Sequence, residues 1–195
     1  MMKHELVATD ILSLEAYERI RDEKRRAVRE IKANRRVAVG PYATFYFENY
    51  DTMWLQVQEM LRIEKGGAAQ LADELEAYNP MVPKGNELTA TVMFEIENPD
   101  RRRQLLAQLG GIERMMELRC GGEAVKGEIE RDLEYATPDG KVSSVLFLHF
   151  RFAAGQAAKF FAAGTEIAIA ITHPEYNHIA IMPAAVKAEL AKDLG

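Results

Sequence analysis

A glutamate stands in the middle of an apolar helix, where an unpartnered charge would be costly. Residues 52–65 are expected to form a helix whose apolar side chains cover most of its circumference, which is typical of a buried helix. Glu59 lies between Leu55 and Ile63 at helical spacing, and Gln56 interrupts the same apolar surface. Because a buried carboxylate needs a partner, Glu59 is a candidate metal ligand or general base.

The alternative for Glu59 is an ion pair without a chemical role. Arg62, three residues later, or an arginine distant in the sequence would satisfy the carboxylate. We favour this alternative, because charged side chains are rarely buried unless they are paired. Glu64 lies five residues after Glu59 and therefore points at a different angle from the helix axis. The candidate polar site consists of Gln56, Glu59, Glu64 and Tyr176.

Three histidines in the C-terminal half form a second candidate site. His149 lies in a predicted strand, and His173 and His178 bracket a segment that is expected to be a loop and that also holds the hydroxyl group of Tyr176. Together with a carboxylate such as Glu59 or Glu95, these histidines would make a site for zinc or non-haem iron. Their spacing matches no known ligand motif, so we favour neutral histidines that are hydrogen-bonded at strand ends.

The first predicted helix carries a cluster of basic residues that could face phosphate groups. Acidic residues are interleaved with them, which favours a solvated helix stabilised by ion pairs between positions i and i+4. No aromatic residue alternates with the basic ones, and the net charge of the chain is -5. Nucleic-acid binding is therefore not expected. The cluster consists of Lys24, Arg25, Arg26, Arg29, Lys32, Arg35 and Arg36.

A row of acidic residues follows one face of a predicted strand. The favoured interpretation is the solvent-facing side of a sheet, where like charges discourage pairing between sheet edges. Docking of a basic partner is the alternative. The row consists of Glu128, Glu130, Asp132 and Glu134.

The elements that must position these residues indicate an α+β fold. A helix is expected over about residues 13–34, with Ser13 as its N-cap. Hairpins dominate the remainder, with turns at the Gly121-Gly122 pair and at residues 138–140. Strands and helices do not alternate as in parallel α/β proteins. We therefore expect a mainly antiparallel sheet built from hairpins, with helices packed on one face.

Composition predicts an ordinary globular protein. The chain has 195 residues, of which 48% are hydrophobic, and its only cysteine, Cys120, excludes an intramolecular disulfide. The sequence shows no signal peptide and no apolar run of about 20 residues, so we expect a soluble, cytoplasmic protein without a membrane segment. We expect one domain over residues 1–195, with residues 79–86 as the alternative boundary, and a homodimer is compatible with the long strands.

Several segments resemble a bacterial family catalogued as domain of unknown function 3501. They are FENYDTMWLQVQEMLRIE, ELEAYNPMVPKGNELTATVMFEIE, SSVLFLHFRF and HPEYNHIAI, and residues 11–41 resemble it as well. The likeness covers essentially the whole chain but implies no chemistry. The residues that it places in signature stretches are Glu48, Asn49, Thr52, Gln56, Glu59, Met60, Glu64, Tyr78, Asn79, Pro80, Pro83 and His173.

The resemblance implies an association with rubrerythrin-like and iron–sulfur redox proteins, beside which members of the family tend to be encoded. Two functions stay open. The favoured one is a non-catalytic accessory or binding protein linked to redox or iron metabolism. The other is an iron or zinc binding protein or metalloenzyme that uses Glu59 with His149, His173 and His178. Whether the protein is an enzyme is therefore not decided by the sequence.

Overall fold

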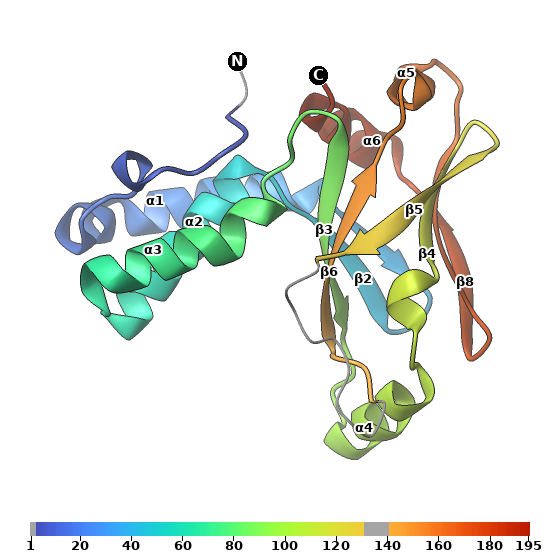
Figure 1. Ribbon diagram of the computed structural model, residues 1–195, viewed down its shortest axis with the longest axis horizontal. Helices are drawn as coiled ribbons and strands as arrows, with labels where there is room; N and C mark the ends of the chain where they lie inside the picture. The colour runs from blue at the N-terminus through green and yellow to red at the C-terminus, as the bar shows by residue number, and fades with distance from the viewer. Residues whose placement is uncertain (1–2, 131–140) are drawn as a thin grey trace.

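A curled antiparallel sheet with a helical arm beside it makes up the protein, as a computed structural model shows (Figure 1). The structure describes residues 3–130 and 141–195. A short 3-10 turn, Ala8–Asp10, precedes helix α1, Leu14–Ala33. The Ser13 hydroxyl accepts a hydrogen bond from the N–H of Ala16, so Ser13 is the N-cap, as predicted.

The remaining elements follow in chain order. The helices are α2 (Tyr50–Glu64), α3 (Gly67–Tyr78), α4 (Pro99–Gln108), α5 (Gln156–Phe161) and α6 (Ala184–Leu190). The strands are β1 (Arg36–Val39), β2 (Ala43–Phe47), β3 (Glu87–Phe94), β4 (Met116–Cys120), β5 (Glu123–Ile129), β6 (Val145–Arg151), β7 (Ile167–His173) and β8 (Tyr176–Ile181). Three further 3-10 turns are Asn79–Met81, Ile112–Arg114 and Ala191–Asp193.

The strand order confirms the predicted α+β class and the antiparallel sheet. Within the described ranges the order is β1-β2-β3-β6-β5-β4-β7-β8, and every neighbouring pair is antiparallel. Gly121 and Gly122 form the turn between β4 and β5 with φ values of 54° and 82°, a conformation that favours glycine. The predicted turn at residues 138–140 lies outside the described residues.

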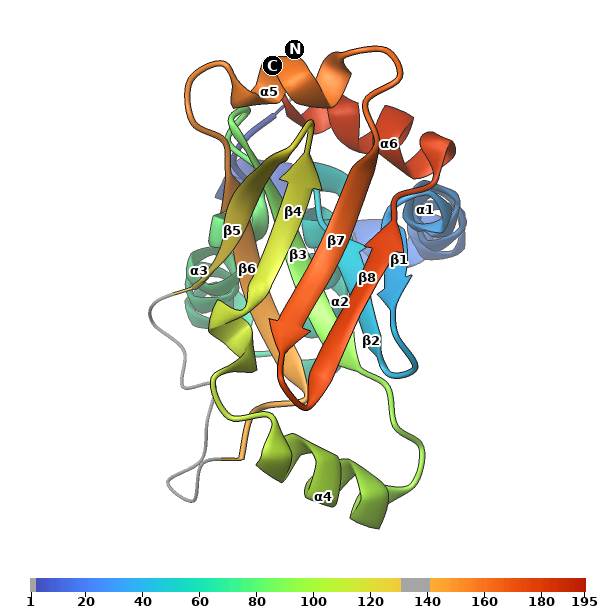
Figure 2. The same cartoon turned by 90° about the vertical axis from the view of Figure 1, so that its right-hand side faces the viewer.

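The sheet curls so strongly that β8 comes to lie beside β1, although these strands stand at opposite ends of the strand order (Figure 2). The inward-facing side chains fill the curl with a continuous apolar core, to which Phe45, Leu148, Phe150 and Ile169 contribute. Burial of this apolar surface is the main force that favours the curl.

Helices α1, α2 and α3 form the arm, which packs on one side of the sheet, whereas α4 lies at one end of the strands and α5 and α6 lie at the other (Figures 1 and 2). The arm has an apolar cluster of its own, which includes Tyr17, Trp54 and Val57. Phe147 of β6 packs against both clusters and so joins the arm to the sheet. No helix within the described ranges is long and apolar enough to span a membrane.

Strand β3 is buried on both of its faces. Leu88 and Val92 point into the curl, while Thr89 and Thr91 point toward the arm and are also buried. The Thr89 hydroxyl donates to the carbonyl of Met81 at 2.6 Å. Coverage of both faces explains why this stretch lacks a strict alternation of apolar and polar residues.

Candidate functional site

Glu59 of α2 lies in an ion pair with α1. Its Oε1 accepts hydrogen bonds from the Tyr17 hydroxyl at 2.5 Å and from Arg21 Nε at 2.8 Å, and its Oε2 accepts from Arg21 Nη2 at 2.8 Å. Of the two interpretations of Glu59, the ion pair is therefore the one that forms. The partner is the distant Arg21, whereas Arg62 pairs with Glu18 at 2.6 Å.

This arrangement holds Glu59 in its ionised form. The hydrogen bonds from Arg21, assisted by that from Tyr17, lower the pKa of Glu59 to about 2. Burial, and then the neighbouring carboxylate, raise the pKa of Tyr17 above its ordinary value. A carboxylate with so low a pKa is a poor general base near neutral pH. The geometry therefore assigns Glu59 to the attachment of α1 to α2.

The other two candidates on α2 make separate contacts with α3. Gln56 Nε2 donates to the Tyr78 hydroxyl at 3.3 Å. Glu64 Oε2 accepts from Gln70 Nε2 at 3.1 Å, and the same nitrogen lies 3.0 Å from Glu74 Oε1. Gln56, Glu59 and Glu64 thus bind three different parts of the arm and do not converge on one point.

Tyr176 closes the seam between β8 and the β1–β2 hairpin. Its hydroxyl donates to the carbonyl of Val39 at 2.8 Å and accepts from the N–H groups of Tyr42 and Ala43, each at 2.9 Å. Burial raises the pKa of Tyr176. The hydroxyl therefore takes the place of missing ladder hydrogen bonds between the two ends of the curled sheet.

The expected loop around Tyr176 is in fact a tight hairpin. His173 ends β7 and pairs with Tyr176, the first residue of β8, so only Pro174 and Glu175 lie between the strands. His178 lies inside β8, opposite Ile171. Residues 176–178 are therefore part of a strand and not of a loop, because their backbone groups pair with β7.

Replacing Tyr176 with phenylalanine is expected to lower the free energy of unfolding by about 1–2 kcal/mol, because buried backbone groups lose their hydrogen-bond partner. Urea unfolding followed by circular dichroism measures the change. Tyr42→Phe is the control, since the Tyr42 hydroxyl contacts Arg101 at the surface. Equal losses in the two variants would contradict the sealing role of Tyr176.

The three candidate histidines occupy separate places. His149 alternates with Leu148 and Phe150, which face the core, so its ring points outward toward the arm. His173 is buried, and its Nε2 lies 3.3 Å from the carbonyl of Gly110. His178 packs edge-on against Tyr176, with 4.6 Å between ring centroids.

The structure does not bring these three histidines together at one point. Strands β5 and β4 separate β6 from β7, so at roughly 4.8 Å per strand His149 and His173 lie about 14 Å apart along the sheet. They also point to opposite faces. Within residues 3–130 and 141–195, no group of three or more His, Cys, Asp or Glu side chains is arranged to hold a metal ion.

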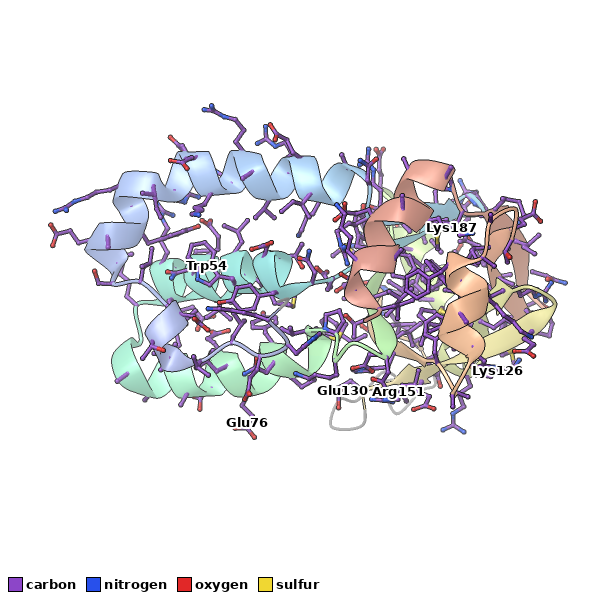
Figure 3. All side chains as sticks on the ribbon, turned by 90° about the horizontal axis from the view of Figure 1, so that it is seen from above. Trp54, Glu76, Lys126, Glu130, Arg151 and Lys187 are labelled. Carbon is purple, nitrogen blue, oxygen red and sulfur yellow. The ribbon has the colours of Figure 1, made fainter. Side chains whose placement is uncertain are left out.

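His149 instead bridges two carboxylates. Its Nδ1 lies 3.0 Å from Glu87 Oε2 and its Nε2 lies 2.9 Å from Glu130 Oε2. Arg151 Nε is 3.3 Å from the same Glu87 oxygen, and Figure 3 shows Glu130 beside Arg151 where the arm meets the sheet. A neutral imidazole has one N–H, so both contacts are hydrogen bonds only when the ring or a carboxyl group carries an additional proton.

The chain is similar in sequence to a known family and similar in sequence and fold to a solved structure. A family model described as "Protein of unknown function (DUF3501)" matches residues 5–194. The chain belongs to this family. A crystal structure from Burkholderia pseudomallei, described as a novel protein of unknown function, has 37% sequence identity and a TM-score of 0.89, over 97% of this chain and 99% of that one. Among proteins of curated function there is no match.

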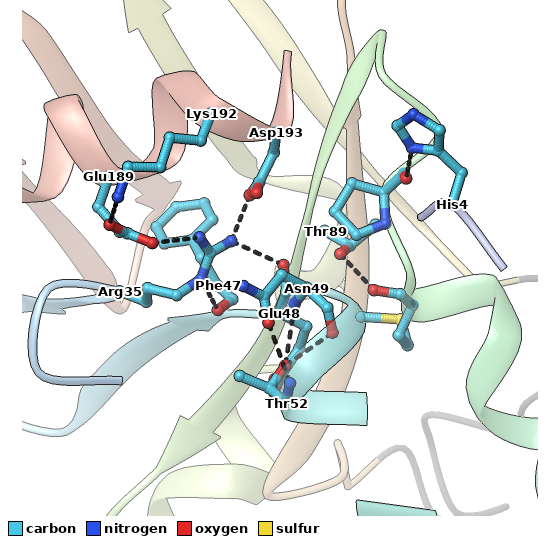
Figure 4. A network of polar contacts seen from close by, with 12 residues as sticks. His4, Arg35, Phe47, Glu48, Asn49, Thr52, Thr89, Glu189, Lys192 and Asp193 are labelled. Atoms are coloured by element: carbon cyan, nitrogen blue, oxygen red, sulfur yellow. Dashed lines mark hydrogen bonds and ion pairs between the residues drawn. The ribbon is translucent and has the colours of Figure 1, made fainter. Parts of the chain in front are cut away.

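Arg35 is a structural residue of this DUF3501 protein, and the prediction that it belongs to the solvated basic cluster is wrong, because it is buried. Its guanidinium is 1% exposed and donates to the carbonyls of Phe47 at 3.0 Å and Glu48 at 2.8 Å (Figure 4). It also pairs with the buried carboxylate of Asp193 and, at 3.4 Å, with Glu189. The alternation of buried Val37 and Val39 in β1 continues back to position 35, and this signal could have revealed its burial.

Most of the remaining basic residues of the cluster are exposed, as expected of a solvated face, but they do not form the expected ion pairs between positions i and i+4. The helix forms one internal ion pair, between Glu15 and Arg19. Among the residues that the structure describes, five basic residues of α1 have no ion-pair partner: Lys24, Arg25, Arg26, Arg29 and Lys32. The acidic residues Asp22, Glu23 and Glu30 of the same helix have no ion-pair partner there either. Arg25, Arg29 and Lys32 lie on one side of α1 by their helical spacing, and Arg36 follows at the start of β1. These four residues are called the cationic stripe: Arg25, Arg29, Lys32 and Arg36.

Proposed function

We propose that the protein is a non-catalytic accessory protein that docks an acidic redox or iron-handling protein through the cationic stripe. The observation that carries the proposal is the exposure of Arg25, Arg29 and Arg36 without ion-pair partners in the described part of the chain. Arginine is well suited to such a surface, since its guanidinium group recognises carboxylates in a bidentate manner.

The contacts of the candidate chemical groups support a binding role. Glu59 is held by Arg21, the Tyr176 hydroxyl is held by backbone groups, and both ring nitrogens of His149 contact carboxylates. Each group would have to give up a structural contact before it could act on a substrate. These groups therefore serve to hold the structural elements together, which suits a protein that binds a partner through its surface.

A rubrerythrin-like or iron–sulfur redox protein is the class of partner that we propose, in line with the family association. Opposite charges on the two surfaces would steer the encounter and make the affinity fall with ionic strength. The stripe contains no aromatic residue on which a base could stack, and the chain has a net charge of -5. These features favour an acidic protein over a nucleic acid.

The double variant Arg25→Glu, Arg29→Glu is expected to bind a purified rubrerythrin-like or iron–sulfur protein of the same organism roughly tenfold more weakly or worse, because two attractions become repulsions. Isothermal titration calorimetry at about 0.05 M and about 0.5 M salt measures the affinity and its screening.

Arg19→Glu is the matched control, since Arg19 is an exposed arginine of the same helix that already pairs with Glu15. This variant should retain the wild-type affinity. The proposal fails if the wild-type protein binds neither partner, or if the control and the double variant lose affinity equally. Binding to duplex DNA that depends on the stripe, without binding to either redox protein, would also overturn it.

A further inference from the structure

We propose that a pocket at the free end of the arm binds a small amphipathic carboxylate with an unbranched acyl chain. The pocket has a volume of about 410 Å³ and lies between the start of α1, the end of α2 and the start of α3, far from the sheet (Figure 1). Its walls are mostly aliphatic and include Leu12, Leu14, Leu61 and Leu71. Ligand pockets of roughly 300–1,000 Å³ combine such walls with a few placed polar groups.

Gln58 supplies a hydrogen-bond donor that a ligand would satisfy. It lines the pocket and is only 2% exposed, and its amide nitrogen is buried without a hydrogen-bond partner among the described residues. A buried donor without an acceptor is unfavourable, and such groups are rare in folded proteins. A rotation of the Gln58 amide group would bring this nitrogen to the pocket, where an oxygen atom of a bound carboxylate would accept from it.

The charges around the pocket favour an anion. Arg62 and Lys65 both line it, and Lys65 has no ion-pair partner in the part of the chain that the structure describes. Gly67 and Ala68, the first residues of α3, line it as well. The N–H groups of a first helical turn are unpaired within the helix and carry partial positive charge. A carboxylate in the pocket would therefore be attracted by these positive charges.

The aliphatic walls define the remainder of the ligand. Leu12 and Leu14 line the pocket from the start of α1, and Leu61 and Leu71 line it from α2 and α3. These side chains offer no hydrogen-bonding atoms, so the portion of the ligand that contacts them must be apolar. An acyl chain with a carboxylate head combines both requirements, whereas a sugar or a nucleotide does not.

Titration of the full-length protein with decanoate, below its micelle concentration, tests this inference by isothermal titration calorimetry. We expect wild-type protein to bind decanoate more tightly than decanol or decylamine, because only decanoate is an anion. Gln58→Leu should weaken decanoate binding roughly tenfold and leave decanol binding unchanged. Its melting temperature should not fall, since leucine removes an unpartnered buried amide.

A matched pair of variants tests the location. Ala68→Trp should abolish binding, because Ala68 lines the pocket, whereas Ala69→Trp should not, since the neighbouring Ala69 is exposed outside it. The variant Arg25→Glu, Arg29→Glu should bind decanoate normally, which separates this site from the cationic stripe. Absence of decanoate binding, equal affinity for decanol, or equal effects of the two tryptophans would overturn the inference.

Discussion

Replacing Arg35 with leucine is expected to lower the free energy of unfolding by about 3–5 kcal/mol, because it leaves a buried carboxylate without its counter-charge. Asp193 is 1% exposed, and burial raises its pKa although Arg35 acts in the opposite direction. The same change removes the donors to the carbonyls of Phe47 and Glu48. The loss is a large fraction of the roughly 5–15 kcal/mol that stabilises a typical domain.

Chemical denaturation of Arg35→Leu, Asp193→Leu and the double variant measures this coupling. The double variant should be more stable than the sum of the two single losses predicts, because it contains no unpaired buried charge. Arg36→Leu is the control, since Arg36 is exposed and unpaired in the described part of the chain. Additive losses, or a similar loss for Arg36→Leu, would show that the pair does not anchor the C-terminus to β2.

Replacing Glu59 with glutamine is expected to lower the free energy of unfolding by about 2–3 kcal/mol at neutral pH, because the ion pair with Arg21 is lost. The pKa of Glu59 falls from 4.5 to about 2 on folding. Its stabilising contribution is therefore complete above pH 4.5 and disappears as the pH falls from 4.5 to about 2. The difference between wild type and variant should shrink over the same interval.

Urea unfolding of wild type and Glu59→Gln between neutral pH and about pH 2 measures this difference. Subtracting the two curves removes the contributions of the other carboxylates, which both proteins share. Glu15→Gln is the control, because Glu15 pairs with Arg19 at the surface and such pairs contribute little. A difference that is constant with pH would refute the ionised state assigned to Glu59.

The sequence by itself determined the features that depend on neighbours in the chain. Ser13 caps α1, and Gly121-Gly122 turns the β4–β5 hairpin, both as predicted. Each follows from local backbone geometry and from hydrogen bonds within a few residues. Even here the boundary differs from the expected one: the helix expected over residues 52–65 begins at Tyr50, with Asn49 as its N-cap and Thr52 completing the capping box.

The identities of the long-range partners were decided by the tertiary structure. Burial of Glu59 made a counter-charge necessary, but only the packing of α1 on α2 selected Arg21. The strand order separated His149 from His173 and placed Glu87 and Glu130 on the two ring nitrogens of His149. Spacing along the chain predicts which face a residue occupies, whereas strand order and register determine what lies opposite.

The glutamate in the apolar helix illustrates this division. Its sequence context determined that the charge at position 59 had to be satisfied, because an unpaired buried carboxylate is too costly to retain. Whether a metal ion, a proton or an arginine would satisfy it depended on a residue 38 positions earlier. In the same helix, only the tertiary structure reveals that the Gln58 amide nitrogen lacks a partner among the described residues and that Gln58 lines a pocket. The local sequence shows that a buried polar group needs a partner, and the packing of distant segments determines which group becomes that partner.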